Sequence, residues 1–383
     1  MKILYLMNHV GKAGAALALY DLIVELKKQY GNSVHPIVIT GAKNELNIAL
    51  DKIGVENYSA PIKNFLTTYR KPVFFWKALL FLRYSFFKPL ALKKIEKLVS
   101  IEDIDIIHSN LDRFDIGAIL AQKFHKHHIW HMREYAEGGL NMMSIIPKPY
   151  CHFNKYFSVT TFVGISKGVC LNWKEHGVNV DKLIYDGVRE ELYKSISQNL
   201  SKPLKIIFLG GYDDQKGQFD FVKNINAFKD ELIGKVIIDF YGNGDIRYLN
   251  EIKRFIKENS MESLVNLYDY DPKIKNKLSN YAIGVNCSRN EGFGRVTVEY
   301  MMSGLCPLVS NSGANKELVT DMDNGLIFDR YSSSSLKEKM LWILSHPDKV
   351  HEFGKKARLY ACENFSMSKH AQEVFSLYET LLK

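Results

Sequence analysis

Short apolar runs alternate along the chain with amphipathic stretches of ten to twenty residues. The short runs are typical of strands buried in a parallel sheet, and the longer stretches are typical of helices that cover it. In the first half, the runs that predict strands are residues 2–7, 36–40, 104–108, 128–132, 161–165 and 183–185. The stretches that predict helices are residues 13–30, 111–125 and 167–176. This order predicts repeated β-α-β units.

The pattern starts afresh after a polar segment, residues 189–203, which predicts a linker. The strands expected in the second half are residues 204–210, 236–241, 264–267, 283–287 and 308–310. We therefore expect an α/β protein of two Rossmann-like, doubly wound domains, residues 1–190 and 204–365, that face each other across a cleft. Residues 366–383 predict a final helix. Ligands of such sheets bind at the carboxyl ends of the strands.

Composition agrees with two globular domains. The chain has 383 residues, of which 46% are hydrophobic and 24% charged, which excludes a disordered or collagen-like protein. Its five cysteines are scattered without a C-x-x-C pair, which indicates a reducing compartment and no structural zinc. The first apolar run meets Asn8 and His9 before it reaches the length of a signal peptide, so it predicts a buried strand.

The net charge of +9 is concentrated in residues 61–100. This segment holds nine basic residues, one acidic residue and nine aromatic residues. Lys77 and Arg83 interrupt its apolar runs, so it is not a membrane span. A segment that lies on an anionic membrane surface is the sharper hypothesis. The alternatives are domain helices with basic outer faces, and a nucleic-acid site, for which no recognised motif is present.

Two glutamates lie close together after the strand expected at 283–287. Glu291 falls in the following loop, and Glu299 lies about two helical turns further on if a helix starts near Gly294. Gly292 and Gly294 leave room for backbone N–H groups to approach an anion or a sugar hydroxyl. Either the two carboxylates face one ligand, or Glu291 is solvent-exposed and Glu299 caps the helix.

The surrounding motifs favour the ligand site. The chain reads NEGFGRVTVEYMMSG at 290–304, LCPLVS at 305–310, SGANKE at 312–317 and DNGLI at 323–327. In this order the motifs resemble those of the retaining GT-B glycosyltransferases of family 4, or group 1, of the type that acts in bacterial surface-polysaccharide synthesis. The resemblance runs from Gly11 to the C-terminal helix, and it implies that this helix packs back on the N-terminal domain.

The resemblance also implies roles for these residues. Glu291 would contact hydroxyls of the donor sugar, and Glu299 would accept hydrogen bonds from the ribose of the nucleotide. The backbone of Gly292, Phe293 and Gly294 would lie against the donor sugar and diphosphate. There the N–H groups of the helix start would stabilise charge that grows on the leaving nucleotide.

A second loop, LGGYDDQKG at 209–217, follows the first strand of the second half. It resembles the G-R-x-x-x-x-K-G loop of the same family, which implies that Lys216 grips the donor diphosphate. Gly211 stands where the family has an arginine, so one phosphate-binding cation is missing. Arg295 either supplies this charge or points outward into solvent.

Two further candidates come from the first half. Gly14 belongs to a glycine-containing turn that is by itself a plain strand-to-helix turn, and the resemblance implies that this loop reaches the donor. His131 ends an apolar strand, and the resemblance implies that it contacts the donor sugar or the acceptor. Arg133 and Glu134 either pair with each other or contact the acceptor. The histidines just upstream are expected at a solvated helix end; they are His125, His127 and His128.

D-x-D triples begin at Asp103, Asp269 and Asp321. Such a triple holds a metal ion in the other major glycosyltransferase fold, but the GT-B resemblance assigns no metal to these positions. We therefore expect no obligatory metal and no cofactor. The donor substrate would be a nucleotide-diphosphate sugar, linked to UDP or GDP.

The resemblance implies a retaining, metal-independent hexosyltransferase. Together with the basic, aromatic residues 61–100, it predicts an enzyme that is cytoplasmic and peripheral on the inner face of the cell membrane. It would move a sugar to a glycan acceptor carried on a lipid, with Glu291 and His131 orienting the sugar and Lys216 offsetting the leaving charge. Two alternatives stay open, a nucleotide-sugar epimerase of similar fold and a non-catalytic partner of another transferase. Gly211 favours the partner, whereas the retained glutamates and lysine oppose it.

Overall fold

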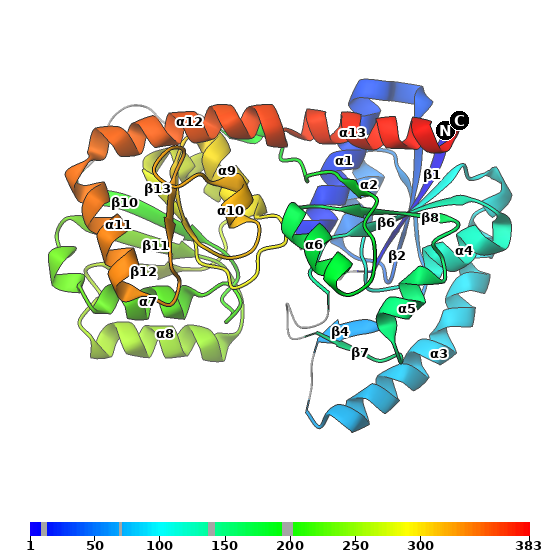
Figure 1. The fold of residues 1–383 in the computed structure, drawn as a ribbon, viewed down its shortest axis with the longest axis horizontal. Helices are drawn as coiled ribbons and strands as arrows, with labels where there is room; N and C mark the ends of the chain where they lie inside the picture. The colour runs from blue at the N-terminus through cyan, green and yellow to red at the C-terminus, as the bar shows by residue number, and fades with distance from the viewer. Residues whose placement is uncertain (9–13, 69–70, 137–141, 194–201) are drawn as a thin grey trace. The chain divides into compact units, whose positions relative to one another are not determined.

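The chain of the computed structural model divides into two compact units (Figure 1). Unit 1 is Met1–Gly187 together with Met367–Lys383, and unit 2 is Val188–Ser366. The structure describes residues 1–8, 14–68, 71–136, 142–193 and 202–383. Gly11, in the N-terminal glycine-containing turn, lies outside the described residues.

Unit 1 is built on a parallel sheet of seven strands in the order β3-β2-β1-β5-β6-β8-β9. The strands are β1 (Lys2–Met7), β2 (His35–Thr40), β3 (Glu56–Ser59), β5 (Ile106–Ser109), β6 (His127–Met132), β8 (Thr160–Gly164) and β9 (Lys182–Leu183). The six strands expected here are present, with ends shifted by one or two residues. The pattern missed β3 because its short sequence, ENYS, is polar and only partly buried at the edge of the sheet.

The structure describes seven α-helices in unit 1. They are α1 (Gly14–Tyr30), α2 (Glu45–Lys52), α3 (Val73–Leu98), α4 (Ile116–Phe124), α5 (Pro149–Asn154), α6 (Lys167–Glu175) and α13 (Met367–Leu381). The pattern predicted those near 13–30, 111–125, 167–176 and 366–383, and it missed those at 45–52 and 149–154. The helix expected at 111–125 begins only at Ile116. The carbonyls of Leu111 and Arg113 accept hydrogen bonds from the Trp130 indole and the Phe65 backbone, so they take no part in a helical ladder.

The last helix of the chain completes the core of unit 1. Figure 1 shows α13, at the red end of the colour range, beside α1. Val374 and Tyr378 of α13 are buried in the same apolar cluster as β1 and α1. The rings of Tyr30 and Phe375 stack with centroids 3.6 Å apart. A segment from one end of the sequence therefore packs on a strand from the other end.

Most of the basic, aromatic segment forms one helix, α3, of 26 residues. The short strand β4 (Leu66–Thr68) precedes it and pairs antiparallel with β7 (Met142–Ser144). No helix in the described part of the chain is long and apolar enough to cross a membrane. The helix is anchored by Asp115, whose Oδ2 accepts hydrogen bonds from Tyr84, Lys88 and His152 at 2.7, 2.7 and 2.8 Å.

Unit 2 is built on a parallel sheet of six strands in the order β12-β11-β10-β13-β14-β15. The strands are β10 (Leu204–Leu209), β11 (Val236–Tyr241), β12 (Val265–Tyr268), β13 (Ile283–Asn286), β14 (Cys306–Ser310) and β15 (Leu326–Phe328). The pattern predicted the first five and missed β15, a three-residue edge strand.

Six helices are described around this second sheet, namely α7 (Gln218–Asn226), α8 (Ile246–Glu258), α9 (Arg295–Ser303), α10 (Asn315–Leu318), α11 (Ser333–Ser345) and α12 (Pro347–Phe365). The strand order reverses between β10 and β13, because β11 and β12 lie on one side of β10 and the later strands lie on the other. This is the switch point of an α/β sheet, where loops leave the carboxyl ends of neighbouring strands in opposite directions and form a binding site.

Replacing the buried anchor of α3, Asp115→Ala, is expected to lower the free energy of unfolding by about 2–4 kcal/mol, because Lys88 loses its carboxylate partner in a mostly buried place. Burial alone would raise the pKa of Asp115, but His152, Lys88 and Tyr84 lower it. The loss is therefore full at neutral pH and shrinks below about pH 4, as the wild-type carboxylate protonates.

Urea unfolding followed by circular dichroism measures this difference. The control is Glu96→Ala, which removes the more exposed ion pair of α3 with Lys123 and is expected to cost less than about 1 kcal/mol. Equal losses for the two variants would show that Asp115 is not the anchor.

Candidate functional site

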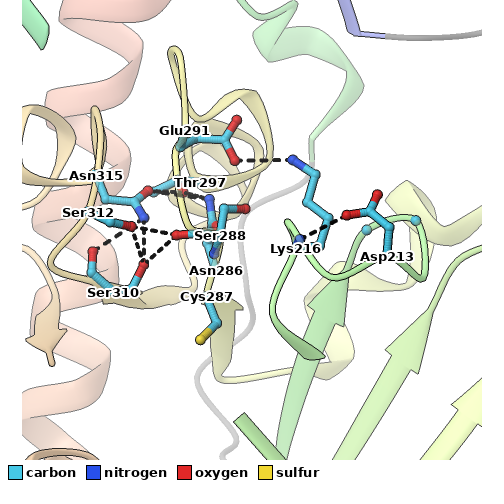
Figure 2. Close-up of polar contacts among 12 residues, drawn as sticks. Asp213, Lys216, Asn286, Cys287, Ser288, Glu291, Thr297, Ser310, Ser312 and Asn315 are labelled. Atoms are coloured by element: carbon cyan, nitrogen blue, oxygen red, sulfur yellow. Dashed lines mark hydrogen bonds and ion pairs between the residues drawn. The ribbon is translucent and has the colours of Figure 1, made fainter. Parts of the chain in front are cut away.

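The switch point of unit 2 brings together two predicted residues that are 75 positions apart in the sequence. Lys216 lies in the loop after β10, and Glu291 lies in the loop after β13. The Lys216 ammonium Nζ is 3.2 Å from Oε2 of Glu291 (Figure 2). The side chains are 36% and 15% exposed, so the pair is sheltered while the lysine stays open to a ligand. This contradicts a solvent-exposed Glu291.

The pair is ionised at neutral pH. The Glu291 carboxylate raises the pKa of Lys216 further than burial lowers it. Burial acts to raise the pKa of Glu291, but the Lys216 charge and the nearby polar side chains of Ser288 and Asn286 lower it on balance. A fixed cation beside an anionic hydrogen-bond acceptor suits a ligand that carries both phosphate and hydroxyl groups.

A buried polar network fixes the loop that carries Glu291 (Figure 2). The Asn286 amide donates to the Thr297 hydroxyl at 2.9 Å, and that hydroxyl donates to the Asn315 side-chain oxygen at 3.2 Å. The hydroxyl of Ser310 donates to the backbone oxygen of Ser288 at 3.1 Å. β13, α9, β14 and α10 thus share one set of hydrogen bonds around the loop. Sequence reasoning missed this network because its members come from four separate elements, and no local pattern indicates that they meet.

Two glycines let the backbone close around Glu291. Gly313 has φ +55°, and a Cβ there would lie 2.5 Å from the backbone nitrogen of Glu291. Gly294 has φ +92° and starts α9 at the predicted place; a Cβ there would lie 2.8 Å from Leu318. Any larger residue at these positions would strain the turn and push the glutamate loop away.

The loop that carries Lys216 is tied to the glutamate loop by a buried arginine that sequence reasoning missed. Arg330 donates to the backbone oxygen of Cys287 at 2.7 Å and to the Asp220 carboxylate at 2.6 Å. Gly217 has φ +77°, and a Cβ there would collide with the Cys287 oxygen at 2.3 Å. Arg330 follows the short strand β15, and no motif around it indicates that it reaches this site.

Glu299 and Arg295 pair with each other. The Nε atom of Arg295 lies 3.4 Å from Oε1 of Glu299, one turn further along α9, and Lys275 lies 3.7 Å from the same oxygen. Glu299 is the fifth residue of α9, so it is not a cap. The Arg295 side chain is largely buried and does not point outward. Its charge faces Glu299.

The glutamate motif also contains Phe293 and Gly292. Phe293 is buried, and its ring meets Phe365 edge to face with centroids 5.7 Å apart. Gly292 is partly exposed in the loop. Gly14 is the first residue of α1, is exposed, and has no atom within 4 Å of a built Cβ, so close approach of a ligand is sterically open there.

His131 lies near the carboxyl end of β6 in unit 1 and is fully buried. Arg133 and Glu134 do not pair with each other. Arg133 pairs with Asp186 at 2.6 Å, and Glu134 pairs with Arg113. The expectation of a solvated helix end holds for His125, the exposed C-cap of α4. His127 is exposed but begins β6, and the expectation is wrong for His128, which is buried between the hydroxyls of Ser109 and Thr160.

The D-x-D triples are engaged in ordinary structural contacts. Asp105 accepts from the backbone of Lys2, Asp271 pairs with Lys277, and Asp321 pairs with Lys339. Among the described residues, no group of three or more histidine, cysteine, aspartate or glutamate side chains is arranged to hold a metal ion.

Comparison with known proteins shows what these features are similar to. Residues 190–360 match the family described as Glycosyl transferases group 1. The chain is 27% identical over 293 residues to an uncharacterized glycosyltransferase of Methanocaldococcus jannaschii, covering 75% of this chain and 78% of that protein. It is 27% identical over 111 residues to a lipopolysaccharide core biosynthesis mannosyltransferase of Rhizobium leguminosarum bv. viciae, covering 29% of this chain and 32% of that protein.

Solved structures show the fold. HepE of Anabaena, in complex with UDP, matches 99% of this chain and 100% of its own with a TM-score of 0.79 and 16% identity. The same protein in complex with UDP-glucose matches with a TM-score of 0.76 and 17% identity. The fold of this chain is therefore GT-B, and its second unit contains a glycosyltransferase group 1 domain. These findings support a GT-B glycosyltransferase.

The variant Arg330→Met is expected to lower the free energy of unfolding by about 2–4 kcal/mol, because Asp220 loses its buried partner and the Cys287 carbonyl loses its donor. Arg254→Met is the control, since Arg254 pairs with Glu258 at an exposed place on α8 and its loss is expected to cost less than about 1 kcal/mol. Chemical denaturation compares the two. A small effect at Arg330 would mean that the two loops hold their places without it.

Proposed function

We propose that this protein is a retaining glycosyltransferase that moves a sugar from a nucleotide-diphosphate sugar to a glycan acceptor carried on a lipid, in surface-polysaccharide synthesis. The observation that carries the proposal is the sheltered Lys216–Glu291 pair at the switch point of a glycosyltransferase group 1 domain. The donor is a UDP- or GDP-sugar.

The relatives support the choice of substrates. HepE is described with UDP and with UDP-glucose, which favours a nucleotide sugar as donor here. The Rhizobium relative is named as a lipopolysaccharide core mannosyltransferase, which favours a glycan acceptor.

In the proposed site, Lys216 binds the diphosphate and offsets the negative charge that develops as the nucleotide leaves. The Glu291 carboxylate accepts hydrogen bonds from hydroxyls of the donor sugar. Gly294 is the N-cap of α9, whose first N–H groups add positive potential near the leaving phosphate. Glu299 accepts from the ribose hydroxyls.

The proposed reaction retains configuration at the sugar. The acceptor hydroxyl attacks the anomeric carbon from the face that the diphosphate leaves, so a carbon–oxygen bond to the acceptor forms as the bond to phosphate breaks. An oxygen of the departing phosphate takes the hydroxyl proton. His131 orients the sugar, and the reaction proceeds without a cofactor or an obligatory metal.

Helix α3 supports association with the inner membrane face. At 3.6 residues per turn, five of its seven exposed large apolar side chains lie on the side opposite the buried Tyr84, Ala91 and Ile95. The other two, Phe74 and Phe81, lie on the flank of the helix. These exposed residues are Phe74, Phe75, Leu79, Phe81, Leu82, Phe86 and Leu90. Phe74 is 87% exposed. Aromatic side chains on a basic helix insert into the boundary between headgroups and acyl chains of an anionic bilayer.

The donor site is tested with Glu291→Gln and Lys216→Met. Each variant is expected to lower kcat/KM for the donor about 100-fold or more, because each loses a charged contact made with the transition state. Thermal stabilisation by a panel of nucleoside diphosphates and their sugars identifies the base, and EDTA is expected to leave turnover unchanged. Lys337→Met, which removes an exposed ion pair with Glu231, is the control.

Three outcomes would contradict the proposal. Donor turnover without any acceptor would favour an epimerase. Absence of binding by any nucleotide would make Gly211 the decisive departure and favour a non-catalytic partner. Full activity of both site variants would show that the ion pair is structural only.

Membrane association is tested by co-sedimentation with vesicles that contain an anionic lipid. The double variant Phe74→Ser/Phe86→Ser is expected to lower the partition coefficient at least about 30-fold, because burying each aromatic side chain contributes about 1.5–3 kcal/mol. Leu359→Ser, at a 72% exposed position on α12, is the matched control and is expected to bind like the wild type. Equal binding by both variants would exclude α3 as the contact surface.

A further inference from the structure

A continuous line of buried hydrogen bonds reaches His131 from the C-terminal helix. The hydroxyl of Tyr5, on β1, is 2.9 Å from the hydroxyl of Tyr378, on α13. The Tyr378 hydroxyl is 2.8 Å from Nδ1 of His108, on β5. Nε2 of His108 is 3.2 Å from Nδ1 of His131, on β6. Within the described chain, Nε2 of His131 is buried and has no hydrogen-bond partner.

The direction of these hydrogen bonds follows from the buried hydroxyl at one end. Tyr5 is fully buried, and Tyr378 is the one partner that its hydroxyl has among the described residues. A buried hydroxyl that donates to nothing costs about 1–3 kcal/mol. The Tyr5 hydroxyl therefore donates to Tyr378, and the Tyr378 hydroxyl is left to donate to Nδ1 of His108.

The direction of the hydrogen bond at one ring nitrogen sets the direction at the other. A neutral histidine carries one proton, so when one ring nitrogen accepts, the other donates. His108 accepts at Nδ1 and therefore donates from Nε2. His131 then accepts at Nδ1 and keeps its own proton on Nε2.

Both histidines are neutral. Burial, together with the neighbouring charge of Arg133, lowers the pKa of His108 and of His131 well below the usual histidine value. Arg133 is itself held in place by Asp186, at 2.6 Å, and by the Asn110 side chain, at 3.0 Å. The Arg133 charge, which adds to the effect of burial on both rings, is thus held in the same core.

We propose that Tyr378 and His108 are positioning residues that fix His131 in the tautomer with its proton on Nε2, so that His131 presents an N–H donor to an oxygen of its ligand. The identity of that ligand, a nucleotide sugar, rests on the proposed function. The tautomer itself rests on the hydrogen bonds of unit 1 alone. The C-terminal helix thereby contributes a hydroxyl group that sets the chemistry of a residue on β6.

The test is a two-bond proton–nitrogen NMR spectrum of the full chain labelled with ¹⁵N-histidine. Wild-type His108 and His131, assigned by His108→Gln and His131→Gln, are expected to carry the proton on Nε2. His370 is an internal reference for a ring with a proton on Nδ1, because its Nδ1 donates to the backbone oxygen of Tyr185 at 2.7 Å. A proton on Nδ1 of wild-type His131 would overturn the proposal without any variant.

Tyr378→Phe removes the hydroxyl and keeps the ring in the core. His131 is then expected to become a mixture of tautomers, and kcat/KM for the donor is expected to fall about tenfold, as for loss of one buried hydrogen bond. Tyr156→Phe removes a hydroxyl elsewhere in unit 1 and is expected to change neither quantity. An unchanged His131 spectrum in Tyr378→Phe would contradict the proposal.

The spectrum and the assay separate this proposal from the proposed function. The expected tautomers with no turnover of any nucleotide sugar would leave the positioning role standing and overturn the proposed function. Turnover of a nucleotide sugar, with a His131 tautomer that is the same in the wild type and in Tyr378→Phe, would support the proposed function and overturn the positioning role.

Discussion

The candidate site depends on one ion pair between two strand ends. Lys216 and Glu291 meet because β10 and β13 are neighbours in the second sheet, although the strands β11 and β12 separate them in the sequence. Their charges stabilise each other at a sheltered position, so each side chain is held in place before a ligand arrives. A preorganised cation needs little rearrangement when charge develops on a leaving group.

Keeping this pair in place requires many buried polar groups, each of which must be hydrogen-bonded. Arg330 joins the two loops at the Cys287 carbonyl, and the Asn286–Thr297–Asn315 network fixes the start of α9. Glycines at 217, 294 and 313 have positive φ and approach neighbouring atoms more closely than a side chain permits. These glycines have low helix and strand propensity, but they allow the loops of the site to adopt their shape.

In the first unit, the far end of the chain has both a packing role and a chemical one. Helix α13 packs its apolar face on α1 and β1, and its Tyr378 hydroxyl reaches His108. Because α13 follows unit 2 in the sequence, the core of unit 1 is built from both ends of the chain. Asp186 is part of the same core, since its ion pair with Arg133 places a fixed charge beside the buried histidines.

The sequence by itself determined most of the strands, the two Rossmann-like sheets and the motif residues Lys216, Glu291 and Glu299. These follow from the spacing of apolar residues and from short motifs, which are properties of neighbouring positions in the chain. Only the tertiary structure decided that Arg295 pairs with Glu299, that Arg330 ties the loops together and that His128 is buried. Arg295 and Glu299 are one helical turn apart, but the other partners lie 19 to 110 residues apart in the sequence, and packing rather than local pattern selects them.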